Sequence, residues 1–208
     1  MKNLIVCVLS LTSVLTLAST VRADDLNEEV ERIKVAATLG GMAGEDQTLR
    51  LSALSLLQRG FKLTDVLAHG ELRRFALESE AKNVTQLRKI FQQFGWIGIN
   101  KYGAQASDNA WLICQHADHD LNFQQECLTL MQRGVENGEA NISNMAFLLD
   151  RIQVNKNEPQ RYGTQGACVD GKWQMSTAED LGKLDERRKT VGLGPISAYN
   201  AEVTLLCK

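Results

Sequence analysis

The chain has 208 residues and a formal charge of −2 at neutral pH, with 44% hydrophobic and 23% charged residues. This mild charge argues against a general binder of nucleic acid or of anionic membranes, because such a protein needs a basic face. Only two prolines and no low-complexity tract or internal repeat are present, so the sequence indicates no linker between domains.

The first 23 residues have the pattern of a secretory signal peptide. Lys2 gives a positive start, residues 4–17 form an almost unbroken apolar run, and small residues flank a cleavage point before Asp24. The run is short for a bilayer span and no second one follows, so no membrane span is expected after cleavage. We expect a periplasmic or secreted protein whose mature part, residues 24–208, forms one domain.

Four cysteines remain in this mature part: Cys114, Cys127, Cys168 and Cys207. An even number of cysteines in an exported protein indicates two disulfides, and three pairings exist on paper. We favour Cys114–Cys127, between neighbouring helices, and Cys168–Cys207, which would fix the C-terminus. A zinc site is disfavoured because no C-x-x-C pair occurs.

Helical spacing of apolar residues predicts four helices in the first half of the mature chain. They are expected at residues 26–41, 45–60, 64–82 and 83–95. Gly40-Gly41 would end the first helix, Thr64 would cap the third and Asn83 would cap the fourth. Gly70 lowers the helix propensity of the third.

The second half continues with helices and one interruption. Helices are expected at residues 107–118, 121–134, 141–154, 177–194 and 197–205, with Ser107 and Thr177 as caps. Asp170-Gly171, between two short apolar stretches, is a hairpin turn signal. The predicted fold is therefore mainly α: a single helical domain with a small β-hairpin near residues 164–175, stapled by two disulfides.

The stretch QHADHD, residues 115–120, ends an apolar helix with two histidines and two aspartates. In a continuous helix Asp120 lies one turn after His116, where it could orient the imidazole and raise its basicity, as a general base needs. Asp150 is the other candidate for this role. The alternative is a helix-end histidine that only bonds a carbonyl. His119 adds a further imidazole, but no third ligand is visible, so neither a metal ion nor a cofactor is expected.

A second unusual stretch is EPQRYGTQG, residues 158–166. Gln160, Tyr162, Thr164 and Gln165 place amides and hydroxyls around Gly163, a residue that lets the backbone approach closely. These groups suit a polar ligand. A well-bonded structural loop is the alternative, because irregular buried backbone also needs hydrogen-bond partners.

Several arginines could bind an anionic group. Arg151 follows Asp150 at the end of an apolar helix face, and Arg187-Arg188 lie on a late helix. A guanidinium can grip a carboxylate with its planar fork, although a solvated surface pair is the more ordinary use. No nucleophile motif and no phosphate loop is present, so a hydrolytic reaction would use activated water.

Five segments together resemble a bacterial exported family of unknown function marked by QHAD, DR and Q-x-Y-G-T-Q motifs. The segments are EDQTLR (45–50), AWLICQHAD (110–118), FLLDR (147–151), PQRYGTQ (159–165) and DERRKTVGL (185–193). The resemblance covers residues 42–199 and implies a shared architecture and polar site rather than a named activity. Its motifs carry over onto Asp46, Gln47, Arg50, Gln115, His116, Asp118, Asp150, Arg151, Gln160, Tyr162, Gly163, Thr164, Gln165 and Arg188.

The first hypothesis is an exported hydrolase or acyl-transfer enzyme that acts on a polar substrate. His116 would be the general acid–base, with Asp120 or Asp150 orienting it. The substrate would be bound by Gln115, Asp118, Arg151, Gln160, Tyr162, Thr164, Gln165 and Arg188. The alternative is a non-catalytic binding, inhibitor or immunity protein that recognises a peptide, a cell-wall fragment or another exported protein.

Overall fold

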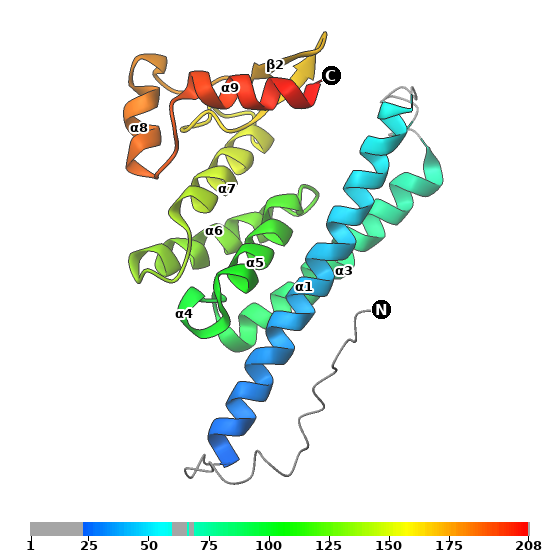
Figure 1. Cartoon of the computed structure of the whole chain (residues 1–208), viewed down its shortest axis with the longest axis vertical. Helices are drawn as coiled ribbons and strands as arrows, with labels where there is room; N and C mark the ends of the chain where they lie inside the picture. The colour runs from blue at the N-terminus through cyan, green and yellow to red at the C-terminus, as the bar shows by residue number, and fades with distance from the viewer. Residues whose placement is uncertain (1–22, 60–65, 67–68, 208) are drawn as a thin grey trace, which may run out of the picture.

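The computed structural model describes residues 23–59, 66 and 69–207, and it is mainly helical (Figure 1). The segment expected to be a signal peptide lies outside the described residues apart from Ala23, and so does Thr64. The elements are α1 (Ala23–Gln58), α3 (Gly70–Phe94), α4 (Ile99–Tyr102), α5 (Ala104–His116), α6 (Leu121–Glu136), α7 (Ile142–Asn155), β1 (Gly166–Val169), β2 (Lys172–Met175), the 3₁₀ helix η1 (Leu181–Lys183), α8 (Leu184–Thr190), α9 (Ile196–Thr204) and the 3₁₀ helix η2 (Leu205–Cys207).

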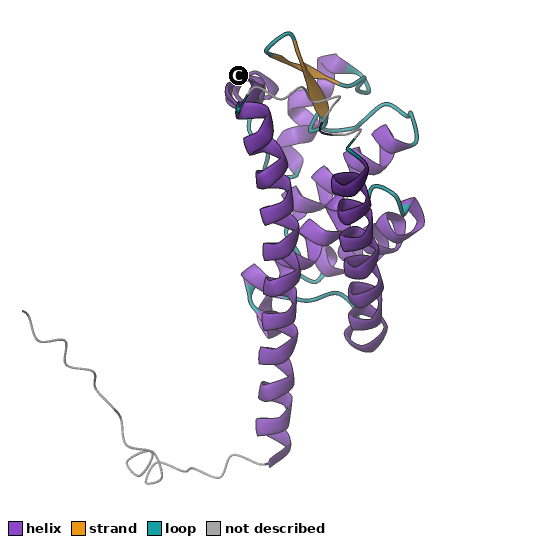
Figure 2. Ribbon diagram, turned by 90° about the vertical axis from the view of Figure 1, so that its right-hand side faces the viewer, coloured by secondary structure: helices purple, strands orange, loops and turns teal. Residues whose placement is uncertain are grey.

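The first helix is longer than predicted. α1 is one continuous helix of 36 residues, so the expected end at Gly40-Gly41 is wrong. A glycine inside a helix costs only about 1 kcal/mol. The buried neighbours Leu39 and Met42, which pack into the core, hold the helix together across this point. α1 therefore runs along almost the whole length of the molecule (Figure 2).

α3 runs antiparallel to α1 and also joins two predicted helices into one (Figure 1). Asn83, expected to be a cap, is 3% exposed in the middle of α3. Ser107 is likewise buried inside α5, which begins three residues earlier after Gly103. Both errors arose because a polar residue that favours helix starts can also be buried within a helix against a neighbour.

The core lies where α5 meets α1, α3, α6 and α7. Leu87, Phe123 and Leu148 are completely buried there. The predicted disulfide Cys114–Cys127 is confirmed and joins α5 to α6 inside this core. It fixes the C-terminal end of α5, the segment that carries His116.

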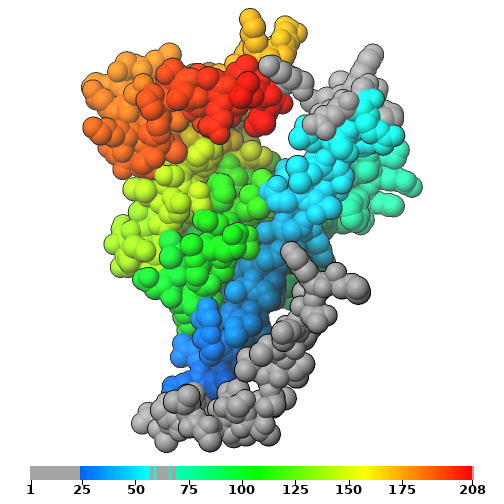
Figure 3. Space-filling view, in the orientation of Figure 1, coloured from blue at the N-terminus to red at the C-terminus, as the bar shows by residue number. Residues whose placement is uncertain are grey.

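The C-terminal elements form a smaller layer at the far end of α7 (Figure 3). The predicted hairpin is confirmed, with β1 and β2 antiparallel around Asp170-Gly171. Both turn residues have positive φ, as a tight hairpin requires. The second predicted disulfide, Cys168–Cys207, is also confirmed and ties the hairpin to η2.

The helix expected over residues 177–194 is shorter than predicted. Only η1 and the seven-residue α8 form there, and Asp180 rather than Thr177 caps η1. Thr177 instead gives its carbonyl to the backbone N–H of Gln160, so it is part of the loop. No helix within the described ranges is long and apolar enough to cross a membrane.

Candidate active site

His116 is the last residue of α5, and its side chain is 16% exposed. Its Nδ1 lies 2.5 Å from Oδ2 of Asp46 on α1. Arg50, one helical turn after Asp46, donates from Nε to the same carboxylate at 3.1 and 3.3 Å. None of the residues that the structure describes hydrogen-bonds Nε2 of His116. The carboxylate thus fixes one side of the imidazole, and the other nitrogen has no partner among these described residues.

The partner of His116 differs from both predicted candidates. α5 ends at His116, so the helical spacing that would bring Asp120 onto the imidazole does not exist. Asp120 instead caps α6 by accepting the N–H of Phe123 at 2.9 Å, and it pairs with Arg88 at 3.3 Å. Asp150 is likewise committed elsewhere, to the backbone of the loop after α7.

Electrostatics keep Asp46 ionised. Burial by itself raises the pKa of its carboxyl group. The hydrogen bond and charge of His116, together with Arg50, lower this pKa by more than burial raises it. The net pKa of Asp46 is therefore below its ordinary value. An ionised carboxylate on Nδ1 favours the tautomer that carries its proton on Nδ1, whose Nε2 can accept a proton.

Asp118 and Arg151 form the second charged pair of the site. Arg151 donates from Nε to Oδ1 at 2.8 Å and from Nη2 to Oδ2 at 2.5 Å, a two-bond fork. Burial raises the pKa of Asp118, but Arg151 and Asn155 lower it more, so the net pKa is lowered. The remaining Nη1 of Arg151 bonds Oε1 of Gln165 at 3.2 Å. The fork is therefore occupied by a protein carboxylate, and Arg151 connects α7 to both the turn after α5 and the loop.

The loop is organised around Asp150, which is completely buried. Its carboxylate accepts the backbone N–H groups of Arg161, Tyr162 and Thr164 and the hydroxyl of Thr164, at 2.8–3.2 Å. Burial raises the pKa of Asp150, and these hydrogen bonds oppose the rise. The carboxylate thus satisfies a turn that has no secondary structure of its own.

Two further predicted binding residues also hold this loop. Gln160 is fully buried and exchanges hydrogen bonds with the backbone of Gln165 at 2.8 and 2.9 Å. Arg188 is 2% exposed and donates to the carbonyls of Gly194 and Tyr162 at 2.6 and 2.7 Å. Burial lowers the pKa of the Arg188 guanidinium, which also lies 5.1 Å from the centre of the Tyr199 ring.

The predicted site residues therefore divide into two groups. The structure brings six residues into a network of two neighbouring clusters. His116 bonds Asp46, which pairs with Arg50, and Arg151 bonds both Asp118 and Gln165. The charge of Arg50 acts on Asp118 across the two clusters. Gln160, Tyr162 and Thr164 lie below the surface of the loop, where their polar backbone or side-chain atoms face protein partners. Gln115 is also buried, and its Oε1 has no hydrogen-bond partner in the described chain.

A cleft of about 770 Å³ lies beside the network, between α1 and α3. Asp46, Arg50, Asp118, His119 and Glu80 line its polar end. The rest is mostly apolar, and its lining residues are Leu49, Ala53, Leu56, Val66, Leu72, Ala76 and Leu77 together with Ser52, Arg73 and Ser79. Glu80 accepts the N–H and contacts Nδ1 of His119 at 2.8 and 2.9 Å, which holds the turn after α5 against α3.

Sequence reasoning missed the role of Asp46 and the cleft. Asp46 belongs to the motif EDQTLR, but it is 70 residues away from His116 in the chain. The one available signal was that the EDQTLR segment belongs to the same family resemblance as the QHAD segment. Within the described part of the chain, no group of three or more histidine, cysteine or carboxylate side chains could hold a metal ion.

A sequence model for the family of unknown function DUF6624 matches residues 65–205. The chain belongs to this family. The DUF6624 match includes His116, Asp118, the Asp150–Arg151 pair and the whole loop. Asp46 and Arg50 precede it, so the partners of the imidazole come from a helix outside the matched range. No curated protein and no solved structure matches the chain.

Proposed function

We propose that this DUF6624 protein is an exported hydrolase in which His116 is the general acid–base and Asp46 orients it. The observation that carries the proposal is the 2.5 Å contact between Nδ1 of His116 and Oδ2 of Asp46, beside a cleft that Asp46 itself lines. An imidazole held by a carboxylate on one nitrogen and free on the other is the arrangement that proton transfer uses.

The reaction would be hydrolysis of an acyl bond by water. Nε2 of His116 accepts a proton from a water molecule as the water oxygen bonds to the acyl carbon. The bond from this carbon to the leaving oxygen or nitrogen then breaks, and the imidazolium returns the proton to that atom. Arg50 lines the cleft beside Asp46, where its guanidinium can stabilise negative charge on the acyl oxygen.

The loop residues act through position. Asp150 and Arg188 fix the loop backbone, and the loop places Gln165 against Arg151. Arg151 in turn holds Asp118, two residues beyond His116. These are positioning residues, because their polar groups are bonded within the fold rather than free for a substrate.

Export to the periplasm or the medium is part of the proposal. It is supported by the apolar N-terminal segment of the sequence and by the two disulfides, which persist in oxidising compartments. We further propose that residues 24–208 work as one domain.

The test compares His116→Gln with the unchanged protein on 4-nitrophenyl esters and anilides of increasing acyl length. We expect His116→Gln to lower kcat/KM by at least about 100-fold, the usual contribution of a general base. His69→Gln is the matched control, because His69 is exposed, whereas His116 is the histidine that bonds Asp46. Equal rates for His116→Gln and the unchanged protein, or no release above buffer by the unchanged protein, would refute the proposal.

A non-catalytic binding protein is the second candidate. It is favoured by the internal use of Arg151, Arg188 and the loop amides, which would explain the polar motifs by folding alone. Such a protein would take a peptide, a cell-wall fragment or another exported protein as its partner. In that case His116→Gln would change the free energy of unfolding while no substrate is turned over.

A further inference from the structure

The cleft between α1 and α3 has one polar end and one apolar end. Asp46 on α1 and Glu80 on α3 lie at the end next to His116, whereas Leu56, Leu72 and Val66 lie at the other end. We propose that this cleft holds a single long acyl chain, whose uncharged ester or amide group lies at the Asp46 end. The position of the acyl bond rests on the proposed function, whereas the binding of the chain does not.

The size of the cleft suits one extended chain. Ten residues separate Asp46 from Leu56, which is about 15 Å along a helix. Glu80 and Leu72, on the opposite wall, are eight residues or about 12 Å apart. The volume of about 770 Å³ lies within the ordinary range of small-molecule sites. A compact polar molecule would leave most of this apolar length unfilled.

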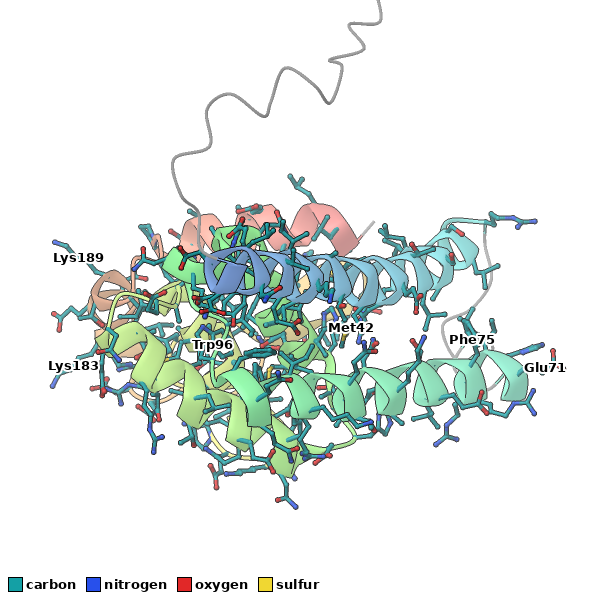
Figure 4. All side chains as sticks on the ribbon, turned by 90° about the horizontal axis from the view of Figure 1, so that it is seen from below. Met42, Glu71, Phe75, Trp96, Lys183 and Lys189 are labelled. Carbon is teal, nitrogen blue, oxygen red and sulfur yellow. A yellow bond between two sulfur atoms is a disulfide. The ribbon has the colours of Figure 1, made fainter. Side chains whose placement is uncertain are left out.

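The far end of the cleft exposes apolar side chains that water disfavours. Leu72, in the wall, is 37% exposed, and the neighbouring Phe75 is 60% exposed. Figure 4 shows Phe75 near the free end of α3, while Met42 lies between α1 and α3 on the side of the body. Met42 is 5% exposed and belongs to the core, whereas the apolar side chains near Phe75 are exposed. Exposed apolar surface of this kind marks ligand grooves.

The charges at the polar end argue for an uncharged group. Asp46 pairs with Arg50 and Asp118 with Arg151, whereas the third carboxylate, Glu80, pairs with His119 and with no arginine or lysine of the described ranges. With neutral imidazoles the polar end carries one excess negative charge. A free carboxylate would be repelled there, but an ester can accept hydrogen bonds from Arg50. Arg73, the other arginine of the wall, lies about 10 Å farther along α3 than Glu80.

Binding of alcohols tests this inference without any turnover. The mature chain is titrated with 1-decanol, 1-hexanol and decanoate by calorimetry. We expect 1:1 binding of decanol and at least tenfold weaker binding of hexanol, because each buried methylene contributes about fourfold in affinity. Decanoate should bind more weakly than decanol. No saturable decanol binding, or equal affinity for the two alcohols, would overturn the inference.

A matched pair of substitutions locates the bound chain. Ala53→Phe fills the cleft, whereas Ala37→Phe places the same ring on an exposed position of the same helix. Ala53→Phe should weaken decanol binding at least tenfold, and Ala37→Phe should leave it unchanged. Equal affinities would place the alcohol elsewhere and overturn the inference. If Ala53→Phe does not fold, Ala76→Phe on α3 replaces it, with the exposed Ala81→Phe as its control.

Two results separate this inference from the proposed function. Decanol binding that persists in His116→Gln, together with unchanged ester hydrolysis in that variant, supports the acyl cleft and removes the catalytic role of His116. Hydrolysis that depends on His116 but is equally fast for acetyl and decanoyl esters, without decanol binding, supports catalysis and removes the acyl cleft. Association of two chains that Ala53→Phe abolishes, without decanol binding, would mean that a second copy occupies the cleft, and it too would overturn the inference.

Discussion

Replacement of Asp150 by alanine tests whether the loop is held from within. The carboxylate accepts the N–H groups of Tyr162 and Thr164, two buried residues, and the N–H of the exposed Arg161. Leaving a buried donor unpaired costs about 1–3 kcal/mol, whereas an exposed one can turn to water. The hydroxyl of Thr164 is a third buried donor, but it can rotate away from the lost carboxylate. The two buried N–H groups therefore give about 2–6 kcal/mol, and we expect the free energy of unfolding to fall by about 4 kcal/mol.

For a chain of this length, 1 kcal/mol corresponds to about 2–4 °C in Tm, so Asp150→Ala should lower Tm by about 8–16 °C. Urea denaturation followed by circular dichroism measures the change directly. Asp185→Asn is the control, because Asp185 is exposed and accepts one hydrogen bond, from the N–H of Ile196. A loss below about 1 kcal/mol for Asp150→Ala would show that water replaces the carboxylate and that the buried loop described above is wrong.

Three other changes have defined outcomes. The pKa of Asp46 is lower in the folded chain than in the unfolded one, so the stability that its ionised form contributes is complete above about pH 4 and is lost as pH falls through the folded pKa. Asp46→Asn should therefore make the acid side of a plot of unfolding free energy against pH shallower. An unchanged slope there would contradict this. Gly163 has φ 68°, and an added Cβ would lie 2.7 Å from Sδ of Met175. Gly163→Ala should therefore lower the free energy of unfolding by at least about 1–2 kcal/mol. An unchanged Tm would show that alanine is not strained at this position. Replacing Cys168 and Cys207 by serine opens a loop closed over a separation of 39 residues. By loop-closure entropy this should lower the free energy of unfolding by about 4 kcal/mol, as measured by urea denaturation under non-reducing conditions. A loss below about 1 kcal/mol would contradict this expectation.

The helical class of the fold was readable from the sequence, but the buried face of α1 was not. Leu26, Val30 and Ile33 have helical spacing, and that spacing indicated a helix. In the structure all three are at least 40% exposed, while Val35 and Leu39 are buried. Periodicity reports that a helix has an apolar stripe, but only tertiary packing decides which stripe the rest of the chain covers.

Helix ends were the least predictable feature for a related reason. Gly40-Gly41 and Asn83 carry local signals for an end or a start, yet both lie inside continuous helices. The local preference is about 1 kcal/mol, whereas burying one large apolar side chain contributes about 1.5–3 kcal/mol. Packing of α1 and α3 on α5 therefore outweighs the local signal. The Asp170-Gly171 turn was predictable because its positive φ values are a local demand that packing does not change.

The site was predictable in its members but only partly in its arrangement. The QHAD and DR motifs identified His116 and Arg151, which lie in the two neighbouring clusters of the site. The prediction that Asp120 orients the imidazole was wrong because it assumed that α5 continues past His116. A partner contributed by α1 depends on how two distant helices pack, and that information is not present in either segment alone.

Two independent parts of the fold meet at the imidazole. Its position is set by α5, which the Cys114–Cys127 disulfide and the amide of Gln124, bonded to the carbonyls of Cys114 and Gln115, hold in place. Its electrostatic state is set by α1, which supplies Asp46. The same helix forms one wall of the cleft. A chain without α1 would keep the imidazole and the hydrogen bonds of the loop, yet it would have neither the orienting carboxylate nor the apolar wall. The candidate site therefore requires α1 in addition to the range that the family model matches.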